Sequence, residues 1–168
     1  MKQNQHTLDQ TVMFVGGCLL FLGGLMIGVA VNGKGAPIVG MAHTLGLLEA
    51  VFMLAFAALR PHVRFNQLNT WIFVGLTFVS FYSNFAGVCM TVITGAGGGM
   101  YLPPWDAYVT NEPTTVNRLV GFLLNMSAAA VALPVMLIMG WFASTRQAVI
   151  TGVSLLFTVV MLYFTFST

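Results

Sequence analysis

Charged residues are scarce in this sequence of 168 residues: there are six Lys and Arg and four Asp and Glu, together 6% of the chain. A soluble globular domain carries about 25% charged residues, so this chain has too few to cover a water-exposed surface. The shortage excludes a cytosolic enzyme, a nucleic-acid-binding protein and a disordered tail. Cysteine is also scarce, and both Cys18 and Cys89 lie within apolar runs, which excludes a secreted disulfide framework.

Apolar sequence is what the chain has in excess, because 58% of its residues are hydrophobic and the mean hydropathy is +0.89. About 20 apolar residues span a bilayer as a helix, so the chain can cross four or five times. The stretches lack the alternation of barrel strands and are therefore expected to be helices. We predict an all-α polytopic bundle forming a single integral-membrane domain over residues 1–168, with spans at about 12–31, 38–59, 69–94, 118–142 and 148–166.

Two features of topology concern the ends of the chain: the side of the membrane on which the N-terminus lies, and whether the last apolar stretch spans the membrane. The polar start, MKQNQHTLDQ, lacks a cleavage site behind it, and we interpret it as a retained cytoplasmic tail. We predict a protein of the bacterial inner (cytoplasmic) membrane, and the distribution of Lys and Arg predicts that its N-terminus lies in the cytoplasm. On this orientation, Lys2, Arg60, Arg64 and Arg146 lie inside, and Lys34 and Arg118 lie outside. The stretch 148–166 is either a fifth span or an interfacial continuation.

Two segments rich in glycine bear on packing. Gly24 and Gly28 form a small-xxx-small pair in the first stretch, which allows close helix packing within one subunit or between subunits. The long segment 95–117 contains glycines that permit tight turns and prolines that stop helices. It is either a connector at the membrane surface or a lid or wall of a pocket.

The second stretch contains two ionisable residues, His43 and Glu49, within GMAHTLGLLEAVFML. An ionisable group inside a membrane span is costly unless it is paired or lines a cavity, so each is a candidate functional residue. Six residues on a helix correspond to about 120° between side-chain directions. The two side chains are therefore not expected to face each other squarely.

His43 admits two interpretations. It is an interfacial histidine that reaches headgroups or a carbonyl, or it is an axial ligand to a metal or haem iron through a neutral imidazole. The other histidines, His6 and His62, lie in the tail and in the first cytoplasmic loop and cannot reach the same depth. A single available histidine would leave one iron position open, and an open position binds substrate.

Glu49 also admits two interpretations, a structural hydrogen bond between helices and a role in substrate binding or proton movement. Asn84, in FYSNFAG of the third stretch, and Asn125, in LLNMSAAA of the fourth, are its candidate partners. An amide both donates and accepts hydrogen bonds, which suits a polar substrate head. Consecutive residues of a helix point about 100° apart, so at most two of Tyr82, Ser83 and Asn84 share a pocket.

The segments GMAHTLGLLEAVFML, FYSNFAG and TGAGGGMYLPPWDAYV resemble the small membrane isomerases, a group that includes hydroxylaminobenzene mutase and styrene oxide isomerase. The resemblance covers residues 12–142, and the glycine-rich stretch before a PW-type loop is more similar to the mutase branch. It implies a trimer that holds haem b between neighbouring subunits, with His43 as the iron ligand. In the epoxide branch an Asn and a Tyr orient the substrate, whereas this chain has Glu49 and Val88 at those places.

The resemblance implies a haem-dependent isomerase that converts an aromatic hydroxylamine to an aminophenol, with ferric iron as a Lewis acid on the substrate oxygen. Glu49, Asn84 and Tyr82 are then the expected catalytic residues, and His43 binds the haem. A small aromatic substrate entering from membrane lipid would contact Asn84, Asn125, Phe81 and Phe85. The alternatives are an isomerase of aromatic epoxides and a membrane carrier or accessory subunit without catalysis.

Overall fold

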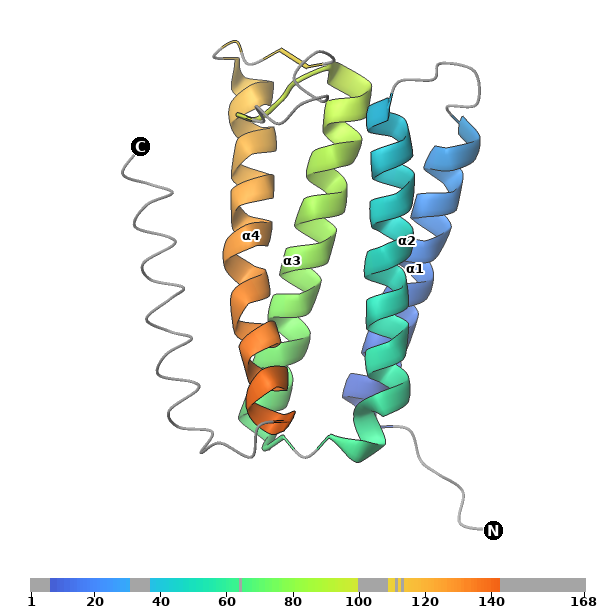
Figure 1. Ribbon diagram of the computed structural model, residues 1–168, viewed down its shortest axis with the longest axis vertical. Coiled ribbons are helices and arrows are strands. Elements are labelled where there is room, and N and C mark those ends of the chain that lie inside the picture. Colours follow the sequence, from blue (N-terminus) through green and yellow to red (C-terminus); the bar gives the residue numbers. More distant parts are fainter. Residues whose placement is uncertain are drawn as a thin grey trace.

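The computed structural model describes residues 7–30, 37–63, 65–99, 109–110, 112 and 114–142. Four long helices run up and down alternately: α1 (Leu8–Ala30), α2 (Pro37–Leu59), α3 (Gln67–Thr94) and α4 (Thr115–Phe142) (Figure 1). A short 3₁₀ turn, η1 (Arg60–His62), follows α2. All regular elements among the described residues are helical, apart from one isolated bridge, which confirms the predicted all-α bundle.

Each of the four helices is long and apolar enough to span a membrane. Between 28% and 44% of the residues in each span are buried inside the protein, so most apolar side chains point outward. An outward apolar surface is what a helix presents to lipid, and these helices are consistent with an integral membrane protein. The expected stretch 148–166 lies outside the described residues.

The helices pack mainly as two antiparallel pairs, α1 with α2 and α3 with α4, and the core joins α3 to the first pair. Leu20, Met53 and Phe81, contributed by α1, α2 and α3, are almost completely buried in this core. Phe56 of α2 lies against Phe73 of α3, with ring centroids 4.1 Å apart. Aromatic packing of this kind helps to fix the position of α3 against α2.

Glycines bring α1 and α2 together at close range. A Cβ atom on Gly24 would lie 3.1 Å from the backbone nitrogen of Leu47, and one on Gly17 would lie 3.2 Å from the carbonyl oxygen of Ala50. A larger residue at these places would force the backbones apart. The small-xxx-small pair Gly24 and Gly28 therefore packs within one chain, which settles the alternatives left open by the sequence.

The described ends of the segment after α3 fold back on α4. Gly95 ends α3 in the left-handed conformation with φ 72°, and Ala96 pairs with Thr110 in an isolated bridge. Asn117 accepts a hydrogen bond from the Gly98 nitrogen at 2.5 Å. These contacts tie the two ends of the segment to the first turns of α4. The residues between them, 100–108, lie outside the described part of the chain.

Candidate functional site

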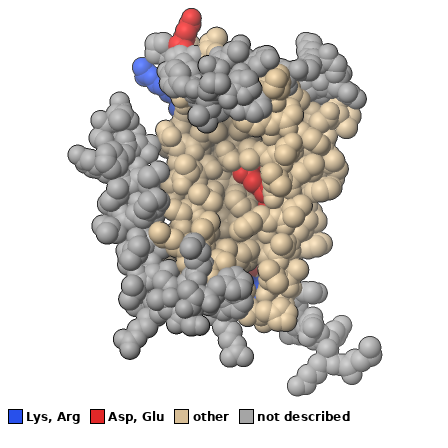
Figure 2. Space-filling model, in the orientation of Figure 1, with Lys and Arg blue, Asp and Glu red and all other residues tan. Residues whose placement is uncertain are grey.

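Glu49 and Asn84 form a polar pair in the middle of the helix bundle. The Asn84 side-chain nitrogen donates a hydrogen bond to Oε1 of Glu49 at 2.9 Å, joining α3 to α2. Glu49 is only 7% exposed. Figure 2 shows acidic atoms at mid-height on a face that is otherwise almost uncharged. The hydrogen bond expected between Glu49 and one of the two asparagines is confirmed for Asn84.

The second carboxyl oxygen of Glu49 has no partner among the described residues. Oε2 is buried, and no hydrogen bond reaches it from any residue that the structure describes. Leaving a buried polar atom unsatisfied costs about 1–3 kcal/mol, and proteins rarely retain one without a functional reason. Thr77 Oγ1 of α3 is the other buried side-chain atom without a partner among the described residues, but only Oε2 belongs to an ionisable group. A polar group of a bound molecule could satisfy Oε2.

His43 lies on a different side of α2 and contacts α1. Its Nδ1 atom is 2.8 Å from the carbonyl oxygen of Gly24. The side chain is half-buried, and within the described residues no hydrogen bond is made to Nε2. The carbonyl that it reaches belongs to a neighbouring helix, not to a loop or a lipid headgroup. One ring nitrogen is thus held by α1, and the other has no hydrogen bond from the described residues.

The two ionisable residues of α2 do not meet within one chain. Six residues separate His43 from Glu49, which corresponds to about 9 Å along the helix axis, and they contact α1 and α3 respectively. The half-buried ring of Phe85 packs against Gly46, which lies between them on α2. A Cβ atom on Gly46 would lie 2.6 Å from this ring. The expectation that His43 and Glu49 do not face each other is confirmed.

The aromatic candidates of α3 are held by other contacts. The Tyr82 hydroxyl donates to the carbonyl oxygen of Gly16 at 2.9 Å, so it points to α1 while Asn84 points to α2. The buried ring of Phe81 meets Phe52 edge-on, with centroids 5.3 Å apart. Tyr82 and Asn84 therefore do not act together on one group within the described chain.

Asn125 is exposed on α4 and does not join the Glu49 pair. The polar link between α3 and α4 is made instead by Ser80, whose hydroxyl donates to the carbonyl oxygen of Ser127 at 3.0 Å. Of the two candidate partners of Glu49, Asn125 is therefore the one that does not bond to it within the described part of the chain. The reason is rotational, because Ser127 and Ala130 occupy the inward side of α4.

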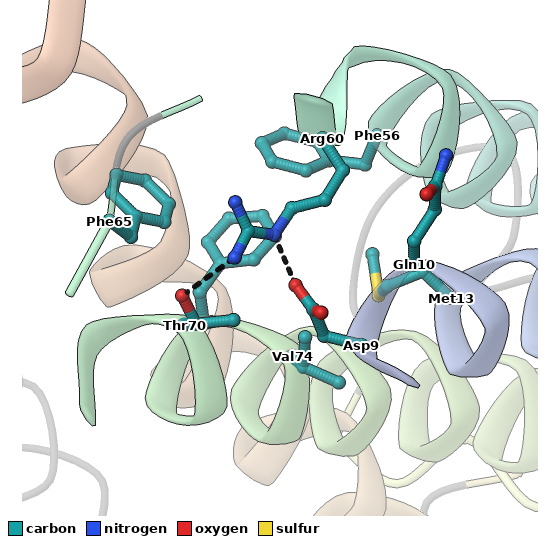
Figure 3. A pocket seen from close by; sticks show the side chains of 9 residues that line it. Asp9, Gln10, Met13, Phe56, Arg60, Phe65, Thr70 and Val74 are labelled. Carbon is teal, nitrogen blue, oxygen red and sulfur yellow. Dashed lines mark hydrogen bonds and ion pairs between the residues drawn. The ribbon is translucent and has the colours of Figure 1, made fainter. Parts of the chain in front are cut away.

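A buried ion pair at the opposite end of the bundle from His43 was not anticipated from the sequence. Arg60 donates to the Val63 carbonyl. Figure 3 shows Arg60 paired with Asp9 of α1 and donating to Thr70 of α3. These residues line a small pocket together with Phe56 and other apolar side chains. In the sequence, Asp9 and Arg60 lie beside the ends of the first two apolar stretches. Their separation of 51 residues gave no local signal of pairing.

The ion pair should stabilise the bundle. Replacing Asp9 with Asn removes the charge opposite Arg60, and breaking a buried pair in this way costs about 3–5 kcal/mol. Because the Arg60 side chain is still 23% exposed, we expect a smaller loss of about 2 kcal/mol. Unfolding of Asp9→Asn in mixed micelles measures the loss. Arg118→Gln, at an exposed position on α4, is the control and should be unchanged; equal stability of Asp9→Asn and wild type would refute the role.

Metal ligands are sparse. Within the described ranges there is no group of three or more His, Cys, Asp or Glu side chains placed to hold a metal ion. His43 is the one candidate ligand that the sequence indicated, and it stands alone at its site. A metal held there would need its remaining ligands from another source.

Comparison with known proteins gives one informative match. The chain is 31% identical over 137 residues to hydroxylaminobenzene mutase HabA from Ectopseudomonas oleovorans, and the match covers 78% of this chain and 97% of that protein. No family model matches the chain, and no solved structure matches it significantly. The likeness agrees with the resemblance of the short motifs around His43, Asn84 and the glycine-rich segment. The chain belongs to the hydroxylaminobenzene mutase family.

Proposed function

We propose that this protein is a membrane-embedded isomerase that rearranges an aromatic hydroxylamine to an aminophenol, with haem b bound by His43. The mutase relative supports the class of reaction. The observation that carries the proposed chemistry is the state of Glu49, whose carboxyl group lies inside an apolar span. One oxygen is bonded to Asn84, and the other has no partner among the described residues. An ionisable residue in such a place is a functional residue by default.

The residues around His43 fit an axial haem ligand. A ligating histidine usually donates its second ring N–H to a carbonyl or carboxylate, and His43 has this contact with Gly24. A haem group would supply most of the iron ligands itself, so His43 alone would suffice to hold it where the described residues form no cluster of metal ligands. Haem bound there would supply a ferric Lewis acid for the substrate oxygen.

The proposed reaction is an isomerisation. The N–O bond of the hydroxylamine breaks, a C–O bond forms on the ring, a ring proton is lost and the nitrogen gains a proton. The atoms and electrons of substrate and product balance without an external oxidant or reductant. Glu49 takes and returns the proton, because a carboxyl group does both, while Asn84 holds its Oε1 atom in place.

The surrounding side chains suit an aromatic guest. Phe85 adjoins Asn84 in sequence and packs beside Gly46 of α2, so its ring is well placed to contact the substrate. The buried ring of Phe81 meets the exposed ring of Phe52 edge-on, and we assign Phe81 a contact with the substrate ring. We assign Tyr82 a supporting role, since its hydroxyl is bonded to the α1 backbone. The apolar walls would keep water away from a cationic intermediate, and the faces of the aromatic rings would stabilise its positive charge.

The assembly and membrane placement form part of the proposal. The resemblance to the isomerase group implies a homotrimer, and Asn125 supports contact with a neighbouring subunit because an exposed amide on a lipid-facing helix needs a partner. The bias of Lys and Arg supports an inner-membrane protein with its N-terminus in the cytoplasm. Light scattering of the detergent-solubilised protein would test the trimer.

Product analysis tests the function directly. Membranes carrying the protein are incubated without oxygen with hydroxylaminobenzene or, in parallel, with styrene oxide, and the products are separated by chromatography. We expect aminophenol from the first compound and far slower turnover of the second. Membranes without the protein are the control. Turnover of styrene oxide alone would favour the epoxide reaction, and a folded, colourless protein that converts neither compound would favour a carrier.

A further inference from the structure

The contact between His43 and α1 defines which ring nitrogen carries the proton. The Gly24 carbonyl can only accept a hydrogen bond, so the nitrogen 2.8 Å from it, Nδ1, must donate. In a neutral imidazole the lone pair then lies on Nε2. Nε2 is the nitrogen to which the described residues make no hydrogen bond. The α1 backbone thereby selects the tautomer that can bind a ligand through Nε2.

Gly28 provides the space in which the ring lies. A Cβ atom on Gly28 would lie 2.5 Å from Nδ1, 2.8 Å from Cε1 and 3.1 Å from Cγ of His43. Cβ atoms in real structures essentially never come within 3.0 Å of a non-bonded heavy atom, so any side chain at position 28 would displace the His43 ring. The hydrogen bond to the Gly24 carbonyl would be displaced with it.

Gly24 brings the accepting carbonyl within reach. A Cβ atom there would lie 3.2 Å from the carbonyl carbon of Gly46 and 3.3 Å from the carbonyl oxygen of His43. The two backbones therefore approach closely at the level of the imidazole. The α1 carbonyl uses one lone pair within its own helix and has a second for His43.

We propose that Gly24 and Gly28 are positioning residues, which together hold the His43 imidazole as the Nδ1–H tautomer with Nε2 free to ligate. We name this pair the imidazole cradle. That Nε2 binds haem rests on the proposed function, whereas the tautomer and the ring position do not. The two glycines thus fix the tautomer and the position of the His43 ring through their backbone geometry, without contributing a side chain.

The tautomer is measured first. Full-length protein with His6→Gln and His62→Gln contains His43 as its sole histidine, and it can be ¹⁵N-labelled in a haem-deficient host. We expect nitrogen chemical shifts of a neutral ring protonated at Nδ1 and unprotonated at Nε2. A ring protonated at Nε2, or one that exchanges between both forms, overturns the proposal. This measurement needs no substitution in the cradle.

Substitution in the cradle is the second test. Gly28→Ala should lower haem affinity by about 10-fold or more, the effect typical of disturbing a ligand's hydrogen-bonded partner, and should reduce the Nδ1–H signal. Gly75→Ala on α3, where a Cβ atom meets nothing within 4 Å, is the neutral control. Gly23→Ala, which presses only on Phe85, controls for altered packing of α1. Unchanged affinity and tautomer in Gly28→Ala would overturn the proposal.

The two proposals fail in different ways. A wild-type protein that binds no haem and makes no aminophenol but shows the Nδ1–H tautomer refutes the function and supports the cradle. A protein that is active and pigmented but shows the other tautomer refutes the cradle alone. If Gly28→Ala does not fold, the tautomer measured in the variant with His43 as its sole histidine still decides whether the cradle proposal holds.

Discussion

His43→Ala should abolish both the haem absorption band and the formation of aminophenol. His43 is the only described histidine inside one of the four long helices, and no hydrogen bond reaches its Nε2 atom from the described residues. Removing a hydrogen-bonded partner of a ligand already costs 10–100-fold in affinity, so loss of the ligand should cost more than about 100-fold. The absorption spectrum of the solubilised protein and the yield of aminophenol are the two measurements.

His62→Ala is the matched control for this prediction. His62 is exposed in the turn after α2 and should leave pigment and turnover at wild-type levels. Circular dichroism shows whether His43→Ala retains its helices. A folded His43→Ala protein with an undiminished haem band would show that another residue binds the haem.

Glu49→Gln should lower turnover of hydroxylaminobenzene by about 100- to 10,000-fold, the range for loss of a general acid–base group. Glutamine has almost the same shape, and its side-chain oxygen can still accept the hydrogen bond from Asn84 that Oε1 accepts now. It cannot take or return a proton. The loss should therefore appear in kcat, with little change in KM.

A second substitution separates proton transfer from positioning. Asn84→Ala keeps the Glu49 carboxyl group but removes the hydrogen bond that positions it. We therefore expect a smaller loss of kcat than in Glu49→Gln, together with a changed KM. Glu112→Gln, an exposed acidic residue between α3 and α4, should have no effect. Unchanged turnover in Glu49→Gln would show that Glu49 has only a structural role.

The helices were largely predictable because hydrophobicity along the chain is a local property. The observed helices α1 to α4 fall on the first four expected stretches, with α1 beginning at Leu8 and α4 at Thr115. Both begin a few residues before the expected stretches at 12 and 118, because the polar residues Asp9 and Asn117 belong to the helices. Asp9 is instead buried by its pairing with Arg60, and Asn117 caps the glycine-rich segment.

The partners of polar residues were predictable only in part. Glu49 was recognisable as exceptional because it stands inside an apolar run, and Asn84 was one of two candidates for its partner. The choice between Asn84 and Asn125 depends on the rotation of α3 and α4 about their axes. Hydrophobic periodicity says little about rotation in a membrane helix, since apolar residues lie on all of its sides.

By itself, the order of residues determined that this protein is an apolar helical bundle and that His43 and Glu49 are its unusual groups, because scarcity of charge and length of apolar runs need no knowledge of contacts. Only the tertiary structure decided that the Gly24 carbonyl accepts a hydrogen bond from His43 and that Asp9 pairs with Arg60. It also decided that one oxygen of Glu49 has no partner among the described residues. Each of these depends on how separate helices are rotated and seated against one another. Side-chain packing across the whole bundle sets that arrangement.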